Sequence, residues 1–322
     1  MEVKFGLVLS LVSMACFTFG TVEAGEVLLF EELFEDADWE TRGWYDGPHM
    51  EITSEEHIEG SGHSCVWHWE EGDVGAREGG GRVRLPPVDE VMLKFHMKHS
   101  ENWAWTGVNW HPHEFHFITN ADHEYVGPAY THLTFYVEVV NGVPRIAIQD
   151  GRNVDEGRIG VDLVDSTEKR AVGGCNGDAD GHGVGDCYQA GDVHRNGKFW
   201  QPEKVYFGEV AGARYKGDWH SVEVRLRLNS LADGKAAKDG VLQYWFDGEL
   251  IMDYGDVVFR TGTHPDMKIN QFLMAPYFGP GAPRAQRIWI DDLRIFTDDG
   301  RSSAVESDNW GSIKRKIKKG SE

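Results

Sequence analysis

The stretch WHSVEVRLRLN, residues 219–229, has the most regular pattern in the chain and sets the expectation for its fold. Every second residue from Val222 to Leu228 is aliphatic, and one glutamate and two arginines lie between them. Because successive side chains of a strand point to opposite faces, this period of two predicts a strand. The aliphatic set would face a core, and the charged set would form the opposite face.

Further short strands are predicted on both sides of this stretch. Asp247-Gly248 separates two of them and is a hairpin signal. The one run of good helix formers, Asn229 to Asp239, is interrupted by Gly234. Short strands and frequent turn residues predict an all-β sandwich rather than an α/β fold. The predicted strands are Ser64–Trp69, Val91–Lys98, Val205–Val210, Val241–Phe246, Glu249–Asp253, Ile269–Tyr277 and Arg287–Phe296.

The first 24 residues have the pattern of a secretory signal peptide. A positive charge at Lys4 precedes an apolar core, and small residues up to Ala24 fit cleavage by a signal peptidase. We therefore expect a secreted or periplasmic protein, and the second-ranked alternative is a lipid anchor at Cys16. The expected organisation is a signal peptide at 1–24, a single domain at 25–297 and a polar, disordered tail at 298–322.

The chain is strongly acidic, with a formal net charge of −21. This balance argues against a nucleic-acid partner, because phosphate binding needs a basic surface. An anionic substrate would have to bind in a locally basic groove. No segment after the signal is long and apolar enough to span a bilayer, and we expect a monomer.

The stretch from Leu93 to Arg152 holds seven of the fifteen histidines, together with several tryptophans and tyrosines. Within it, a polar set from His132 to Glu138 alternates with apolar residues. In a strand, the apolar set faces the core and the polar set forms a row of hydrogen-bonding and stacking groups. Such a row is typical of a sugar-binding sheet face, and equally of a solvated face rich in threonine and tyrosine.

Three cysteines remain after removal of the signal peptide. Cys175 and Cys187 bracket a short polar loop, and export makes a disulfide between them the expected state. Cys65 is then left over, and we expect a buried free thiol.

The loop between these cysteines resembles the start of an EF-hand calcium loop. Asp178 and Asp180 stand at alternate positions before a glycine, and Asp186 offers a later ligand. The twelfth position is Cys187 rather than glutamate, and no helices flank the loop. The alternative is a disulfide-closed turn rich in aspartate and glycine, residues that tolerate left-handed backbone.

Four segments in the last third carry a family resemblance. They are DWHSVEVRLRLN (218–229), KDGVLQYWFDGELI (238–251), KINQFLMAPYFGPG (268–281) and RIWIDDLRIF (287–296). Together they resemble the closing strands of secreted jelly-roll polysaccharide lyases of the alginate, glucuronan and heparin lyase kind, which implies a concanavalin-like sandwich. Lectins and carbohydrate-binding modules share the same closing hairpin, so the resemblance bears on the fold more than on the activity.

The resemblance implies cleavage of a uronate-containing polysaccharide by β-elimination. The reaction needs a base for the C5 proton, an acid for the leaving oxygen, and groups that neutralise the carboxylate. Arg145 and Gln149 lie four apart on one side of a strand and are candidates for the carboxylate. Candidates for base and acid are His132 with Tyr136, His113 with His116, and Tyr277. The sequence departs from the alginate lyases at YFGPG, where it lacks their lysine.

Other residues are candidates for binding rather than catalysis. Trp103, Trp105 and Trp110 would provide a stacking platform for sugar rings, or one or two of them would belong to the core. The predicted substrate-binding residues are Trp105, Trp110, His113, His116 and Tyr130.

Two further sets of residues bear on metals. The spacing of His111, His113 and His116 suits a transition metal, although scattered histidines without a metal are the alternative. The family resemblance also implies a structural calcium ion between the first and last strands, with Glu35 and Asp292 as ligands. A plain acidic surface is the alternative, and no organic cofactor is expected.

The sequence therefore predicts a secreted jelly-roll protein that acts on a polysaccharide, with a lyase as the first hypothesis. The second is a non-catalytic, lectin-like carbohydrate-binding module. The third is a glycoside hydrolase of the same fold, for which the sequence lacks a strand of paired acids.

Overall fold

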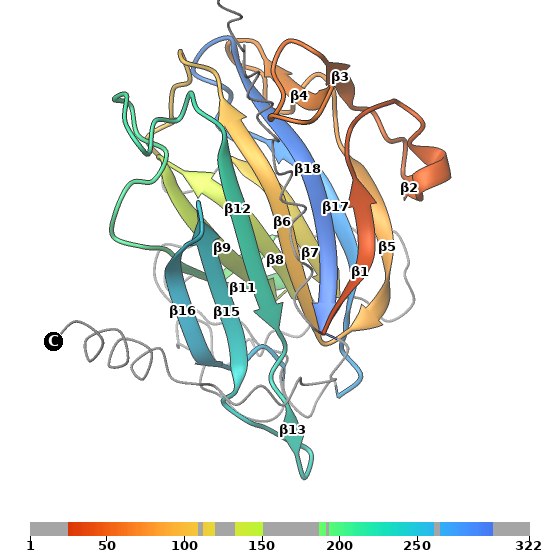
Figure 1. Cartoon of the computed structure of the whole chain (residues 1–322). Coiled ribbons are helices and arrows are strands. Elements are labelled where there is room, and N and C mark those ends of the chain that lie inside the picture. Colours follow the sequence, from red (N-terminus) through yellow and green to blue (C-terminus); the bar gives the residue numbers. More distant parts are fainter. Residues whose placement is uncertain are drawn as a thin grey trace, which may run out of the picture. The chain divides into compact units, whose positions relative to one another are not determined.

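Two sheets pack face to face and enclose the hydrophobic core of this all-β protein (Figure 1). The computed structural model describes residues 25–108, 112–119, 133–150, 187–190, 193–260 and 265–298. The segment from Val27 to Asp298 forms one compact unit. No helix in this described part is long and apolar enough to cross a membrane.

The first sheet has eight strands, and neighbours along its path run antiparallel. Figure 1 shows β6 and β18 side by side in its middle. The order is β16 (Glu249–Val257), β15 (Gly240–Phe246), β12 (His220–Arg227), β6 (Glu90–His99), β18 (Gln286–Asp298), β4 (Ser64–Trp69) and β3 (Glu51–Thr53), with β1 (Glu26–Glu32) also paired to β18.

The second sheet also has eight strands with antiparallel neighbours. The order is β10 (Cys187–Ala190), β11 (Val193–Trp200), β9 (Val143–Asp150), β8 (Leu133–Val140), β7 (His113–Thr119), β17 (Ile269–Tyr277), β5 (Gly81–Val88) and β2 (Trp44–Tyr45). The remaining elements of the described residues are a hairpin, β13 (Leu231–Ala232) with β14 (Lys235–Ala236), and one short 3₁₀ helix, η1 (Glu40–Arg42).

Aromatic side chains from the two sheets meet in the core. The rings of Phe95 on β6 and Phe115 on β7 have centroids 4.6 Å apart, which joins one sheet to the other. On β8, Leu133, Phe135 and Val137 are buried in this core, as their alternation predicted. The polar set of β8 takes the other face, but it is also buried rather than solvated. The sandwich fold and the two faces of β8 are therefore confirmed.

Most predicted strands are present, and one prediction is wrong. Residues 205–210 form bends rather than a strand, because the amides of Tyr206 and Phe207 both donate to the carbonyl of Gly142. The run of helix formers from Asn229 to Asp239 contains the hairpin of β13 and β14. Its turn has positive φ at Asp233 (52°) and Gly234 (73°), which a helix cannot accommodate.

Candidate active site

One row of side chains crosses the outer face of the second sheet, away from the core. The antiparallel register aligns one residue from each of several neighbouring strands, so that their side chains stand in a line. This brings a cation, an imidazole and phenol rings from distant parts of the sequence together. The row consists of Tyr45, Arg82, Leu273, His116, Tyr136, Ala147 and Phe199.

A pocket of about 570 Å³ lies over this row. Arg82, His116 and Tyr136 line it from the row itself. His113 and Tyr277 line it from the neighbouring pair of β7 and β17. Five polar or aromatic side chains from four strands therefore converge on one cavity.

A glycine-rich segment before β5 forms another wall of the pocket. A Cβ atom on Gly80 would lie 1.6 Å from the carbonyl oxygen of Met274, and one on Gly81 would lie 2.7 Å from the Trp44 ring. No larger residue fits at either position without displacement of its neighbours. The glycines therefore let the segment pack directly against β17 and bound the cavity.

The aromatic rings of the pocket are in mutual contact. The centroid of the Tyr136 ring lies 4.7 Å from that of His113 and 4.8 Å from that of His116. Tyr277 lies nearly parallel to His113, with centroids 6.4 Å apart and an interplanar angle of 9°. Tyr136 is buried, whereas Tyr277 is 43% exposed. Tyr277 is therefore the phenol more accessible to a large ligand.

A buried ion pair between Glu138 and Arg145 supports the imidazole of His113. Nδ1 of His113 lies 2.5 Å from Oε2 of Glu138, and Oε1 of Glu138 accepts a 2.6 Å hydrogen bond from Nε of Arg145. Burial alone raises the pKa of Glu138, but Arg145 and His113 outweigh it and lower the pKa to about 2. Glu138 is thus an ionised carboxylate held between a guanidinium and an imidazole.

The contact with Glu138 fixes both the orientation and the tautomer of His113. A carboxylate only accepts hydrogen bonds, so Nδ1 of His113 carries the proton and Nε2 is the basic nitrogen of the neutral ring. The carboxylate also stabilises the imidazolium that forms when Nε2 takes a proton. This arrangement is the one in which an aspartate or glutamate supports a histidine general base.

His116 has a different electrostatic environment. Burial, with the neighbouring His113, lowers the pKa of His116 to about 3. Its Nδ1 is buried and has no hydrogen-bond partner among the described residues. His116 is therefore a neutral imidazole at physiological pH and provides no proton to a leaving group.

Arg82 supplies positive charge at the pocket wall. Its Nη1 donates a 2.8 Å hydrogen bond to Oε1 of Gln271, which also accepts a 3.2 Å hydrogen bond from the hydroxyl of Tyr45. Asp46 also lines the pocket, and its Oδ2 lies 3.6 Å from Nε of Arg82. Gln271, which Tyr45 also contacts, thus holds the guanidinium in place, where it can pair with a carboxylate of a ligand.

Four of the residues predicted from the sequence share this pocket. They are Tyr136, His113, His116 and Tyr277.

Arg145 and Trp105 occupy other positions. Arg145 is not among the residues that line the pocket and pairs with Glu138, so it supports His113 rather than holding a substrate carboxylate. Trp105 packs against the core, with its ring 5.2 Å from His99 and 5.7 Å from the buried Trp103. The core alternative for these two tryptophans therefore describes their place better than a stacking platform does.

Several predictions fall outside the described residues. These are the roles of His132, Trp110 and Tyr130, the calcium ligands Asp178, Asp180 and Asp186, and Cys175 of the disulfide. Gln149 and Cys187 are placed as members of β9 and β10, and their side chains are not described. Cys65 is a buried free cysteine whose thiol pKa is raised by that burial.

The two predicted calcium ligands between the first and last strands line a pocket of about 230 Å³. Glu35 accepts hydrogen bonds from Ser61 Oγ and the Gly62 amide, both at 2.9 Å. Asp292 pairs instead with Arg294, while the preceding Asp291 lies 3.4 Å from Ser61 Oγ. Glu35 and Asp292 therefore line the same pocket, and each carboxylate already contacts protein donors.

Sequence reasoning missed Glu138 and Arg82 as parts of the site. Glu138 belongs to the same alternating set as Tyr136, which was a usable signal. Arg82 follows the glycine run on β5. In the sequence it lies far from the other site residues, which belong to β7, β8 and β17. Its place is set by the register of β5 with β17, which the sequence does not reveal.

Structural similarity was found to several polysaccharide lyases. An alginate lyase, Aly36B, in complex with alginate tetrasaccharide shares 12% identity, with 84% of this chain and 96% of that one covered and a TM-score of 0.49. An endo-β-1,4-glucuronan lyase from Trichoderma reesei shares 13%, with 86% and 100% covered and a TM-score of 0.48. The alginate lyase from Aplysia kurodai shares 13%, with 77% and 87% covered and a TM-score of 0.46.

These are lyases of the kind that the closing strands resemble. Neither protein-family models nor curated proteins match the chain. At such low identity, the roles of individual residues rest on the geometry of this chain alone.

Proposed function

We propose that this protein is a polysaccharide lyase that cleaves a uronate-containing glycan by β-elimination in the pocket of the second sheet. One observation carries the proposal: an oriented histidine, two tyrosines and an arginine converge on a single cavity. These are His113, Tyr136, Tyr277 and Arg82.

Arg82 is the proposed partner of the uronate carboxylate. Neutralisation of that carboxylate makes the adjacent C5 proton more acidic and stabilises the enolate-like intermediate. Gln271 is a positioning residue, since it accepts a hydrogen bond from Arg82. Because the whole chain carries a net charge of −21, a local guanidinium is needed to hold an anionic sugar at this site.

His113 is the proposed base and Tyr277 the proposed acid. Nε2 of His113 takes the C5 proton, and the electrons of the C5–H bond form a C4–C5 double bond. The bond between C4 and the glycosidic oxygen breaks, and the phenol of Tyr277 donates its proton to that oxygen. Glu138 stabilises the imidazolium of His113 in this state.

The proposal is tested by following the ultraviolet absorbance of unsaturated uronate products while the protein is incubated with a panel of uronate polysaccharides. We expect a rise with at least one of them. His113→Gln and Tyr277→Phe should each lower kcat by about 10²–10⁴-fold, the usual contribution of a proton-transfer group. His57→Gln is the control, because His57 is exposed and is not among the residues that line the pocket.

The lectin-like alternative gives a different result in the same experiment. Glycan binding, seen as retarded migration in a glycan-containing gel, without any rise in absorbance across the panel would contradict the lyase proposal. Binding by Tyr277→Phe that matches the wild type, together with lost turnover, would support it.

A further inference from the structure

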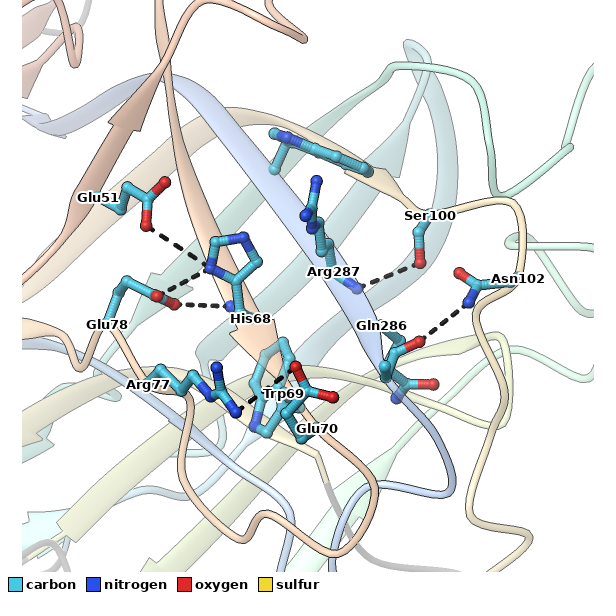
Figure 2. A pocket seen from close by; sticks show the side chains of 12 residues that line it. Glu51, His68, Trp69, Glu70, Arg77, Glu78, Ser100, Asn102, Gln286 and Arg287 are labelled. Carbon is cyan, nitrogen blue, oxygen red and sulfur yellow. Dashed lines mark hydrogen bonds and ion pairs between the residues drawn. The ribbon is translucent and has the colours of Figure 1, made fainter.

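A second pocket lies on the first sheet, on the side away from the core, and has no part in the proposed lyase chemistry. Its volume is about 610 Å³ (Figure 2). His68 on β4 and Arg287 on β18 lie opposite each other in its floor, because the register of the two strands pairs them. Glu51, on the short edge strand β3, and Glu78, in the loop after β4, line the pocket beside His68.

Three potential metal ligands converge at one end of this pocket. Nδ1 of His68 lies 2.8 Å from Oε1 of Glu78 and 3.7 Å from Oε2 of Glu51. One ligand atom from each residue falls within 4.8 Å of the other two, and no other group of three such residues does so among the described residues. In Figure 2 both carboxylates point toward the imidazole ring.

The backbone holds these side chains in place before any ligand binds. Oε2 of Glu78 accepts a 2.9 Å hydrogen bond from the backbone amide of His68, which turns Oε1 toward the ring. The amide of Arg77 donates to the carbonyl of His68, which ties the loop to β4. Glu51 is placed by the pairing of β3 with β4. A site assembled in this way is preorganised, because little conformational freedom is lost on binding.

The charges at this end of the pocket favour a cation. Two carboxylates lie close to each other with one imidazole between them, and like charges at this separation repel. Glu78 is largely buried, with 15% of its side chain exposed, so water screens this repulsion only in part. A divalent ion would neutralise both carboxylates at once.

The ligand set also limits the kind of ion. One imidazole nitrogen and two carboxylate oxygens suit Zn²⁺ or a related transition-metal ion better than Ca²⁺ or Mg²⁺, which prefer oxygen ligands only. Three protein ligands leave a further coordination position for water or another ligand in the pocket.

The same pocket also contains an unsatisfied hydrogen-bond donor. The side chain of Gln286 is only 3% exposed, and its Nε2 has no hydrogen-bond partner within the described part of the chain. Such a buried amide is unfavourable unless it finds an acceptor. An oxygen atom in the pocket, of water or of a ligand, would satisfy it.

The geometry points to a binding site for one divalent transition-metal ion, such as Zn²⁺, held by Nδ1 of His68 and by one carboxylate oxygen each from Glu51 and Glu78. The ion ties the edge strand β3 to β4 and to the loop that follows it. It is therefore a structural clamp at the edge of the first sheet, separate from the pocket of the second sheet.

Calorimetric titration of the metal-stripped full chain with Zn²⁺, followed by thermal unfolding with and without Zn²⁺, tests this site. The variants are Glu51→Gln, His68→Ala and Glu78→Gln. Loss of an outer-shell partner alone lowers metal affinity about 10–100-fold, so loss of a direct ligand should lower it by about 100-fold or more. Each variant should bind one equivalent fewer than the wild type and lose the rise in Tm on zinc addition.

Glu70→Gln is the matched control, because Glu70 lines the same pocket but stands outside the group of three ligands. It should bind zinc as the wild type does. Glu51→Gln keeps the test decisive if the other variants fail to fold. The Glu51 side chain is 48% exposed, so its replacement leaves no buried gap.

Three results would overturn the assignment. They are a wild-type chain that binds no zinc, the same stoichiometry and affinity in all three ligand variants, and a loss of affinity in Glu70→Gln equal to theirs. The first two would leave a plain ion pair between His68 and the carboxylates, and the third would indicate nonspecific attraction to acidic groups.

Discussion

Replacing Glu138 by glutamine should both destabilise the fold and impair catalysis. Glu138 is buried and ionised, with a pKa of about 2 against an ordinary value of 4.5. At about 1.4 kcal/mol per pKa unit, the ionised carboxylate contributes about 3 kcal/mol to stability at neutral pH. The substitution also leaves the guanidinium of Arg145 buried without its counter-ion, so we expect a loss of about 3–5 kcal/mol in the free energy of unfolding.

Urea unfolding of a double-mutant cycle separates these contributions. The cycle consists of Glu138→Gln, Arg145→Met and the combined variant. If the unpaired guanidinium causes much of the loss, the combined variant should be more stable than the sum of the single losses predicts, by about 1–3 kcal/mol. A loss of less than about 1 kcal/mol in Glu138→Gln, or strictly additive effects, would refute the reasoning.

The same cycle has a catalytic readout. Glutamine can still contact His113 but cannot stabilise its imidazolium, so Glu138→Gln should lower kcat by about 10²-fold or more with little change in KM. Equal activity in this variant and the wild type would remove Glu138 from the proposed mechanism.

The remaining predictions concern pH and charge. Because the pKa of Glu138 is depressed, its contribution to stability is present above about pH 4.5 and is lost as pH falls toward about 2. The difference in the free energy of unfolding between the wild type and Glu138→Gln should therefore shrink as pH falls through this range, and a difference that stays constant from about pH 5 to about pH 2 would contradict the depressed pKa. His116, with a pKa of about 3, should show no ring titration by NMR between about pH 5 and 8, and a midpoint in that window would contradict its neutral state. Arg82→Gln should lower kcat/KM by about 10²-fold on a uronate glycan, whereas an unchanged value would exclude it as the carboxylate partner.

Local pattern in the sequence was sufficient for most of the fold. The period of two in β12 is set by burial of one face, and that cause is local to the strand. One prediction failed where another influence was stronger. Hydrogen bonds to Gly142 overrode the strand-like pattern of residues 205–210.

The candidate site could be predicted only in part, because its members meet through strand register. Tyr136 and His116 are recognisable as polar residues in apolar strands, and their pairing follows once β7 and β8 are neighbours. The roles of Glu138 and Arg145 depend on a buried ion pair across β8 and β9. That pair turned Arg145 from an expected substrate ligand into a support for His113.

The most direct test of the lyase account is the mass of the two fragments produced from a defined uronate oligosaccharide. Elimination adds no water, so the masses of the fragments should sum to that of the substrate, and one fragment should carry the C4–C5 double bond. His113→Gln should form neither fragment at an appreciable rate. Fragments whose masses sum to the substrate plus one water would show hydrolysis and contradict the central claim.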